Sequence, residues 1–170
     1  MTVCTGNICR SPMAEVVLRD RLEAAGLGDR VVVDSTGVSD EEHGNPIDRR
    51  ARAALAARGY PVPARQARQV RGSDLAERDL VLAMTASHAR ALRRLATDDE
   101  VASRVVMFRT FDPAAPAVRD VRDEHVLDVD DPWYGGPQEF EVCLDEIEAA
   151  ADGVVEAVRA ALDERDATRA

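Results

Sequence analysis

Short apolar runs alternate along the chain with longer segments of helical periodicity. Runs that suit buried strands occur at Val31–Val33, Leu80–Met84 and Val105–Phe108, and Thr2–Val3 suits the end of a further strand. Between these runs, apolar side chains recur at helical spacing. Such alternation is typical of parallel sheets with crossover helices. The pattern predicts an α/β fold: a doubly wound four-stranded parallel sheet flanked by helices on both faces, in a single domain.

Capping residues and glycines mark where the helices begin and end. The stretch from about Phe111 to Pro137 shows no regular pattern and is expected to be irregular, as lids and binding loops often are. We expect one domain over residues 1–165 and a disordered tail over residues 166–170. The predicted helices run from Ser11-Pro12 to Gly26, from Asp48 to Gly59, from Ser73-Asp74, from Ser87, and from about Gln138 to Glu164.

Composition narrows the class of protein. The 170 residues are 45% hydrophobic and 32% charged, which fits one globular domain. No apolar run approaches the roughly 18 residues of a membrane helix, and no secretory signal is visible. A net charge of −10 disfavours general nucleic-acid binding. Three cysteines are too few for a disulfide framework, so we expect a reducing, cytoplasmic location, with neither a membrane nor a nucleic acid as partner.

Titratable residues are distributed unevenly. Residues 49–71 contain seven Arg and no acidic residue, whereas residues 112–152 contain 13 acidic residues and two Arg. We interpret most of both segments as solvated surface. All 22 basic residues are Arg, so a motif that contains Arg arises easily by chance. The three histidines, His43, His88 and His125, show no metal-ligand spacing, and we expect structural roles for them.

The most specific pattern is a cysteine followed six positions later by an arginine, where the first strand meets the first helix. The five residues between Cys4 and Arg10 can wrap one tetrahedral oxyanion and direct successive backbone N–H groups at its oxygens. The dipole of the following helix adds positive potential, and the planar guanidinium of Arg10 can hold two phosphate oxygens. This potential favours the thiolate of Cys4, a nucleophile aimed at a bound phosphorus.

Neighbouring residues suit the same loop. Gly6 and Asn7 tolerate the unusual backbone angles of a tight anion-binding turn. The Ser11 hydroxyl can donate to the cysteine sulfur and stabilise it as a leaving group. Two interpretations of Cys9 stay open. It is either a loop thiol without catalytic duty or the partner of Cys4 in a reversible disulfide that protects the nucleophile from oxidants.

These residues match the pattern of a known family. Val3–Glu15 agrees throughout with V-C-x-G-N-I-C-R-S-P-x-A-E, and agreement continues at Val33–Gly37, Gly44–Asp48, Ala67–Val70 and Asp131–Gly135. The chain therefore resembles the low-molecular-weight protein tyrosine phosphatases over nearly its whole length, and the bacterial members most of all. The resemblance implies the fold predicted above and a phosphatase that uses no metal and no cofactor.

The resemblance also implies roles for individual residues. Cys4 would form a phosphocysteine, Arg10 would bind the phosphate and the transition state, and Asp131 would serve as general acid and then as general base. Asn7, with Ser35 behind it, would hold the loop in shape. Phosphotyrosine-bearing proteins would be the substrates. Separately from the resemblance, we expect Tyr134 to be exposed beside the site and to be phosphorylated by a partner tyrosine kinase. The residues expected to line the substrate are Thr5, Gly6, Asn7, Ile8, Cys9, Ser11, and, around its aromatic ring, Trp133 and Tyr134.

The residues themselves give independent support for Asp131. A phenol leaves poorly as phenolate near neutral pH, so an acid worth about 10²–10⁴-fold in rate is expected. Like charge from Asp128 and Asp130 favours the protonated form of Asp131. Two of only six aromatic residues, Trp133 and Tyr134, follow it directly, where they can meet a ligand. The alternative, that Asp131 only caps the turn after it, stays open.

The chain departs from the family pattern in three places. Only three residues precede Cys4, so either the start of the chain is misplaced or the central strand is short, and we expect added upstream apolar residues to raise the melting temperature. Thr85 stands where the family often has Asp. Residues 38–47 lack the aromatic residue that many members place on the second wall of the substrate site. The preferred substrate is therefore the least determined property.

Three other functions stay open. Protein-arginine phosphatases on the same fold carry Thr where this chain has Ile8, whose branched apolar side chain suits an aromatic substrate better. A thiol-dependent arsenate reductase needs resolving cysteines on a mobile segment, and Cys143 falls within the last predicted helix. A non-catalytic phosphate-binding module would not need Cys4, Arg10 and Asp131 together.

Overall fold

The computed structural model describes residues 1–169 and contains a four-stranded parallel sheet. Its strands lie in the order β2-β1-β3-β4, so that the first strand is in the interior and the crossovers lead outward in both directions. The predicted fold class, a doubly wound four-stranded parallel sheet, is confirmed. The strands are β1 (Thr2–Cys4), β2 (Ser35–Gly37), β3 (Val81–Ala83) and β4 (Val105–Met107).

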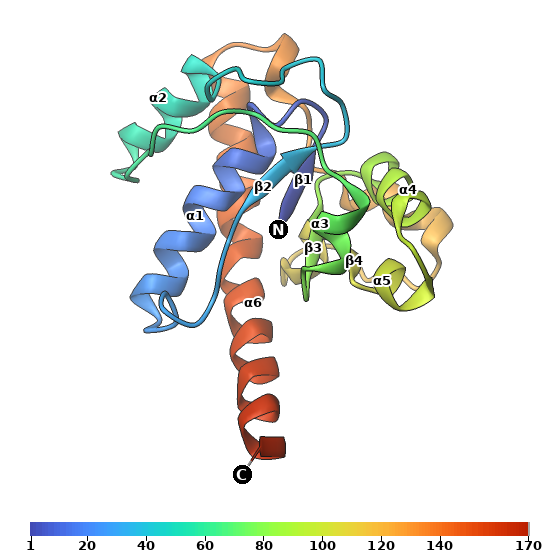
Figure 1. Cartoon of the computed structure of the whole chain (residues 1–170). Helices are drawn as coiled ribbons and strands as arrows, with labels where there is room; N and C mark the ends of the chain where they lie inside the picture. Colours follow the sequence, from blue (N-terminus) through green and yellow to red (C-terminus); the bar gives the residue numbers. More distant parts are fainter. Residues whose placement is uncertain (170) are drawn as a thin grey trace.

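Side chains of the strands alternate between two apolar cores. Val81 and Ala83 face one core, and Leu82 between them faces the other, as the period of a strand requires. Figure 1 shows α1 and α6 on one side of the sheet and α3, α4 and α5 on the other. The helices are α1 (Arg10–Ala24), α2 (Arg49–Ala57), α3 (Gly72–Ala76), α4 (Ala86–Leu95), α5 (Asp99–Ser103) and α6 (Pro137–Arg169).

The strand predicted at Val31–Val33 is wrong, because the paired strand begins two residues later, at Ser35. The valines lie beyond the end of the sheet: Val32 is 83% exposed, and the carbonyl of Val33 accepts from the side chain of Arg19. The Ser-Thr-Gly strand is fully buried because it lies beside β1. At the start of β1, the amino group of Met1 donates to Leu80 O at 2.9 Å, and burial lowers its pKa to about 6.

The predicted start of α2 and the predicted end of α1 are confirmed, whereas the predicted start of α1 is wrong. Asp48 caps α2 by accepting from Arg50 N at 2.7 Å, and Gly26 takes the left-handed conformation after α1 (φ 72°). The N-cap of α1 is Cys9 rather than Ser11. The Ser11 hydroxyl does not cap because it turns inward, 3.1 Å from Thr36 O.

On the other side of the sheet, α4 is capped by Thr85 rather than by Ser87. Thr85 Oγ1 accepts from His88 N at 3.3 Å. Helix α3 starts after Arg71 rather than at Ser73. Helix α5 was not predicted, although Asp98 caps it. Its five residues are too few for a readable helical period.

Three short 3₁₀ helices follow β4: η1 (Phe108–Phe111) comes directly before the irregular stretch, and η2 (Val121–Leu127) and η3 (Pro132–Tyr134) lie within it. After it, α6 continues to Arg169, so the disordered tail expected over residues 166–170 is wrong for residues 166–169, and Ala170 lies outside the described residues. Ion pairs Arg30–Asp166 (2.8 Å) and Arg165–Asp79 (3.0 Å) tie the last turns to the domain. The boundary at residue 165 stays a prediction.

The basic and acidic segments are in part each other's partners, so their interpretation as separate solvated surfaces is wrong in part. Arg58 of α2's C-terminal end contacts three carboxylates of α6, those of Glu141 (2.8 Å), Asp145 (2.7 Å) and Glu148 (2.7 Å). These pairs join α2 to α6 beside the shared apolar core. Counting charges along the chain identifies the basic and acidic segments, but it does not predict that their side chains form ion pairs with each other.

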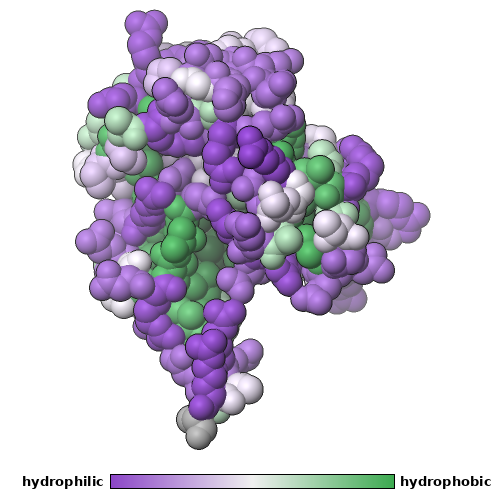
Figure 2. All heavy atoms as spheres, in the orientation of Figure 1, coloured by the Kyte–Doolittle hydropathy of each residue, from purple (hydrophilic) through white to green (hydrophobic). Residues whose placement is uncertain are grey.

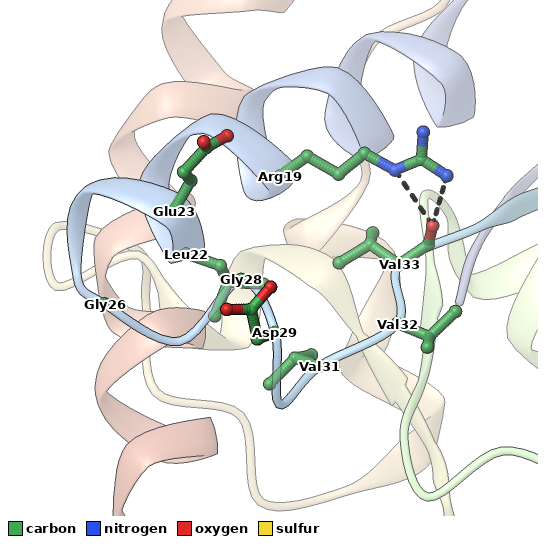
Figure 3. Close-up of a pocket in the computed structure, with 9 residues that line it drawn as sticks. All are labelled: Arg19, Leu22, Glu23, Gly26, Gly28, Asp29, Val31, Val32 and Val33. Atoms are coloured by element: carbon green, nitrogen blue, oxygen red, sulfur yellow. Dashed lines mark hydrogen bonds between the residues drawn. The ribbon is translucent and has the colours of Figure 1, made fainter.

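A hollow of about 530 Å³ lies at the C-terminal end of α1, lined by Leu22, Val31 and Val32 among others (Figure 3). Helix α1 has 15 residues, so this hollow is about 20 Å along the helix from the loop that precedes it. Figure 2 shows a mostly hydrophilic surface, with an apolar area beside the projecting end of α6. Within residues 1–169, no helix is long and apolar enough to cross a membrane.

Candidate active site

The candidate nucleophile lies at the carboxyl end of β1, where doubly wound folds place their ligands. Cys4 is 3% exposed, and its Sγ is 3.1 Å from Ser11 Oγ. Ser11 has a single hydroxyl proton, which can be donated either to Thr36 O or to the sulfur. When Cys4 is a thiolate, that proton turns to the sulfur, because an anion is the stronger acceptor.

Carbonyl groups in and next to the loop from Thr5 to Cys9 accept hydrogen bonds from the surrounding backbone. Val38 N donates to Cys4 O (2.9 Å), Ser39 N to Thr5 O (3.0 Å) and Asp48 N to Ile8 O (2.8 Å). Among the described residues, by contrast, the N–H groups of residues 6–10 have no hydrogen-bond acceptor. Free donors at the start of a helix are the arrangement that binds an oxyanion. The backbone therefore leaves free the N–H groups that the predicted cradle would need.

Asn7 is the centre of the loop's support. It is fully buried in the left-handed region (φ 60°), where asparagine is tolerated. Its Nδ2 donates to Ser11 Oγ and Ser35 Oγ, both at 2.9 Å. Its Oδ1 accepts from Arg65 Nη2 at 2.6 Å and from Arg68 N at 3.1 Å. All hydrogen-bonding atoms of the amide are thus engaged, and Ser35 lies where loop support was expected.

Arg65 is a supporting residue that the sequence analysis missed. Besides Asn7 Oδ1, it donates to Asn7 O at 3.0 Å, so it grips both the side chain and the backbone of that residue. Its Nε lies 3.6 Å from Glu15 Oε2, which accepts from Ser35 Oγ at 2.5 Å. Burial lowers the pKa of Arg65, and the nearby carboxylate of Glu15 opposes that shift. In a chain whose basic residues are all Arg, nothing in its local sequence distinguishes it.

Two glycines permit the close approach of segments around the loop. A methyl group on Gly37 would lie 2.5 Å from Thr5 O, so β2 can end against the loop only because this position has no side chain. A methyl group on Gly6 would lie 2.8 Å from the Cγ of Glu42. The turn containing Glu42 is therefore in contact with the loop and forms one side of the site.

Arg10 and Asp131 meet at the site although 120 positions separate them in the chain. Arg10 Nη2 is 2.5 Å from Asp131 Oδ2, and Arg10 Nη1 donates to Val129 O at 3.1 Å. The Arg10 side chain is 5% exposed and that of Asp131 42%. The other oxygen of Asp131 accepts from Trp133 N at 3.1 Å and caps η3. Asp131 thus caps the turn and also pairs with Arg10.

His88 is a second residue whose position the sequence did not indicate. It is 5% exposed, and its Nε2 is 2.9 Å from Thr5 Oγ1, which in turn lies 3.4 Å from Arg10 Nη2. Burial, together with the positive charge of Arg10, lowers the pKa of His88 to about 4. A neutral imidazole therefore stands behind the first residue of the loop. Its Nδ1 is buried and has no hydrogen-bond partner among the described residues.

The two aromatic residues expected to line the substrate site, Trp133 and Tyr134, are exposed, and Arg50 forms hydrogen bonds to the backbone of this segment. Trp133 is 39% exposed and Tyr134 is 94% exposed. Arg50 donates to Trp133 O at 3.1 Å and to Gly135 O at 2.9 Å, and its guanidinium lies 5.4 Å from the Trp133 ring centroid. Asp48 pairs with Arg50 at 3.0 Å. The start of α2 therefore positions both the loop, through Asp48 N, and the wall.

The three cysteines are unpaired and buried. Burial raises the pKa of Cys9, and the nearby carboxylate of Asp48 raises it further. Burial also raises the pKa of Cys143 to about 12. Both thiols are therefore poor nucleophiles near neutral pH. Among residues 1–169, no group of three or more His, Cys, Asp or Glu side chains is arranged to hold a metal ion.

Comparison with known proteins identifies the family. The profile described as low molecular weight phosphotyrosine protein phosphatase matches residues 1–164. A low molecular weight protein-tyrosine-phosphatase of Streptomyces coelicolor is 48% identical over 165 residues, 97% of this chain and 96% of that one. The low molecular weight protein-tyrosine phosphatase A of Mycobacterium tuberculosis is 44% identical, over 89% of this chain and 86% of that one.

Solved structures agree with the sequence matches. A protein tyrosine phosphatase of Entamoeba histolytica, crystallised with Hepes in its active site, superposes with a TM-score of 0.82 at 27% identity, over 94% of this chain and 96% of that one. YfkJ of Bacillus subtilis superposes with a TM-score of 0.79 at 30% identity, over 93% of this chain and 92% of that one. The chain belongs to the low molecular weight phosphotyrosine protein phosphatase family.

Proposed function

We propose that this chain hydrolyses phosphotyrosine in proteins through a phosphocysteine intermediate, with Cys4 as nucleophile. The observation that carries the proposal is the convergence of a buried cysteine, a loop of free N–H groups, and a close Arg10–Asp131 pair at one point. None of these three features alone indicates a phosphatase. Together they supply a nucleophile, a cradle for the transferred phosphoryl group, and a proton donor.

In the first step the phosphate dianion takes the place of Asp131 on Arg10. The thiolate of Cys4 then attacks phosphorus in line with the tyrosyl oxygen, and the S–P bond forms as the P–O bond breaks. Asp131 gives its proton to the departing phenolate oxygen. Negative charge of the phosphate beside Asp131 favours the protonated carboxyl that this step needs. The pair seen in the free protein is thus the resting state of the acid.

In the second step a water molecule attacks the phosphocysteine. Asp131, now a carboxylate, accepts a proton from the water as its oxygen bonds to phosphorus. The S–P bond breaks, and the Ser11 hydroxyl, 3.1 Å from the sulfur, stabilises the thiolate that leaves. Inorganic phosphate departs and the Arg10–Asp131 pair forms again. The side chains of Asn7, Ser35 and Arg65 act by holding the loop in position.

An aromatic substrate is favoured over the alternatives. Trp133 and Tyr134 offer exposed ring surface beside the acid, which suits a phenyl ring. Arsenate reduction needs a resolving thiol that can reach Cys4, and Cys143 is 1% exposed within α6. A protein-arginine phosphatase shares the same phosphate loop and is the competing proposal, with Ile8 as the residue that favours tyrosine.

Kinetics with p-nitrophenyl phosphate test the mechanism. Cys4→Ser should abolish hydrolysis without added metal, whereas Cys143→Ser should retain it. Asp131→Asn should lower turnover about 10²–10⁴-fold for poor leaving groups and much less for good ones, because good leaving groups need no proton. Asp130→Asn is the matched control. Equal losses for good and poor leaving groups would remove Asp131 as the acid.

Paired peptides decide the substrate. Phosphotyrosine and phosphoarginine peptides of the same sequence should differ in kcat/KM by a large factor in favour of phosphotyrosine. Preference for phosphoarginine would replace the proposal by the competing one. Failure of the protein to turn over either peptide, with tight binding of phosphate, would favour a non-catalytic phosphate-binding module.

Location and regulation are further parts of this proposal. Three unpaired cysteines fit the reducing cytoplasm. The hydroxyl of Tyr134, on a side chain that is 94% exposed, is accessible to a partner tyrosine kinase. Mass spectrometry of the protein from its own cells should find a phosphate on Tyr134, and consistent absence under conditions of active kinase signalling would contradict the kinase as partner.

A further inference from the structure

A groove of about 700 Å³ runs between α2 and the start of α6, next to the candidate active site. Its lining includes Arg49, Ala53 and Ala57 from α2 and Pro137 and Glu141 from α6. The groove begins at the phosphate loop, because the residue at its end, Asp48, donates its N–H to Ile8 O at 2.8 Å. A chain that enters the site at its phosphotyrosine can therefore continue into this groove.

Helix α2 itself carries three arginines and no acidic residue, and the carboxylates of Asp48 and Glu141 also line the groove. Of the seven arginines in residues 49–71, four are engaged by carboxylates: Arg50 by Asp48, and Arg58, Arg65 and Arg68 by more distant partners. Among the described residues, the side chains of Arg49, Arg52 and Arg71 have no ion pair. Arg49 and Arg52 are exposed, three positions apart in α2, and so lie on one face of the helix. Of these three arginines, Arg49 lines the groove, and Arg52 lies about one turn further along α2.

The segment that precedes α2 carries the opposite charge. The turn that contains Glu42 contacts the loop at Gly6, and Ser39 N donates to Thr5 O at 3.0 Å. Asp40 and Glu41 in this turn are exposed and have no ion pair within residues 1–169. Acidic flanking residues of a substrate would be repelled on this side and attracted along α2.

We propose that the groove along α2 binds acidic residues that flank the phosphotyrosine of the substrate protein, with Arg49 and Arg52 as the recognising cations. This inference rests on the proposed phosphatase function and specifies the substrate class. The exposed methyl groups of Ala53 and Ala57 let a peptide backbone lie close to the helix. Helix α2 is about 12 Å long from Arg49 to Ala57, enough for three or four extended residues.

The test uses four phosphotyrosine peptides with identical cores. One peptide carries three Glu residues on the N-terminal side of phosphotyrosine, and a second carries them on the C-terminal side. The other two peptides carry Ala in the corresponding places. At low salt we expect one Glu peptide to have a KM about two- to fivefold below its Ala partner for each arginine engaged, with kcat little changed. The double variant Arg49→Ala, Arg52→Ala should abolish this difference, and 0.5 M salt should weaken it.

Arg94→Ala is the matched control, because Arg94 is also an exposed arginine without an ion pair in the described residues and lies near the end of α4. It should leave the Glu-to-Ala ratio unchanged. Hydrolysis of p-nitrophenyl phosphate and of the Ala peptides should be the same in all variants, which separates this test from the test of the phosphatase function. Equal KM values for Glu and Ala peptides would overturn the inference.

Two further outcomes would also overturn it. One is a Glu preference that survives in the Arg49→Ala, Arg52→Ala variant, because another surface would then be responsible. The other is unchanged peptide kinetics in that variant with loss of binding to vesicles of phosphatidylserine and phosphatidylcholine. That result would assign the two arginines to a lipid surface instead of a substrate.

Discussion

Replacement of His88 by Gln tests whether a neutral imidazole is buried behind the loop from Thr5 to Cys9. His88 is 5% exposed, and its Nε2 lies 2.9 Å from Thr5 Oγ1. Burial and the charge of Arg10 lower its pKa to about 4 from the ordinary 6.5. Between these two pH values the unfolded chain binds a proton that the folded protein does not bind. The free energy of unfolding must therefore fall as the pH falls through this range.

The linkage between proton binding and folding gives the size of this change in the free energy of unfolding. A pKa difference of about 2.5 units corresponds to about 3 kcal/mol when fully expressed, and about 2 kcal/mol of it lies between pH 6.5 and pH 4.5. The contribution is fully present above about pH 6.5 and is lost as the pH falls toward 4. Gln does not titrate, and its amide can still bond to Thr5 Oγ1.

Urea denaturation at pH 6.5 and pH 4.5 measures the difference. From pH 6.5 to pH 4.5, the free energy of unfolding of the wild-type protein should fall by about 2 kcal/mol more than that of His88→Gln. This difference does not depend on how much the substitution itself destabilises the protein. His43→Gln replaces an exposed histidine and should follow the wild type. If His88→Gln shows the same loss as the wild type, His88 is not buried in its neutral form and the described contact with Thr5 is wrong.

Three other perturbations test the support of the loop. Arg65→Met removes both bonds to Asn7 and should lower kcat/KM for p-nitrophenyl phosphate about tenfold or more, whereas unchanged kinetics would show that the loop holds its shape without Arg65. Gly37→Ala puts a methyl group 2.5 Å from Thr5 O and should cost about 1–3 kcal/mol in urea denaturation; a neutral effect would contradict the close approach. Iodoacetamide near pH 7.5 should alkylate Cys4 first, because burial raises the pKa of the other two thiols; a first adduct elsewhere would contradict their burial.

The hydrophobic pattern of the sequence correctly predicts a strand where the strand is apolar and lies in the interior of the sheet. Leu80–Met84 contains β3, and its apolar run is explained by burial on both faces. The same reasoning fails at Val31–Val33, whose apolar side chains lie beyond the sheet. Beta-strand β2 consists of Ser35, Thr36 and Gly37, which are buried because of their neighbours and because Gly37 must lie against the loop. No local pattern predicts that.

The candidate site is predictable to the extent that it is local in the chain. Cys4, the loop and Arg10 are consecutive, so their spacing alone indicates an oxyanion cradle. Arg65 and His88 reach the loop from other elements, and neither has a distinctive sequence context. The sequence suggested Asp131 as an acid, but that it pairs with Arg10 follows only from the folding of the long irregular stretch back onto the loop.

A crystal structure of the protein soaked in orthovanadate tests the central claim most directly. We predict vanadium bonded to Cys4 Sγ, its equatorial oxygens accepting from the N–H groups of residues 6–10 and from the Arg10 guanidinium, and Asp131 released from Arg10 toward the apical oxygen. Vanadate bound away from Cys4, or bound there with the Arg10–Asp131 pair still closed, would contradict the account.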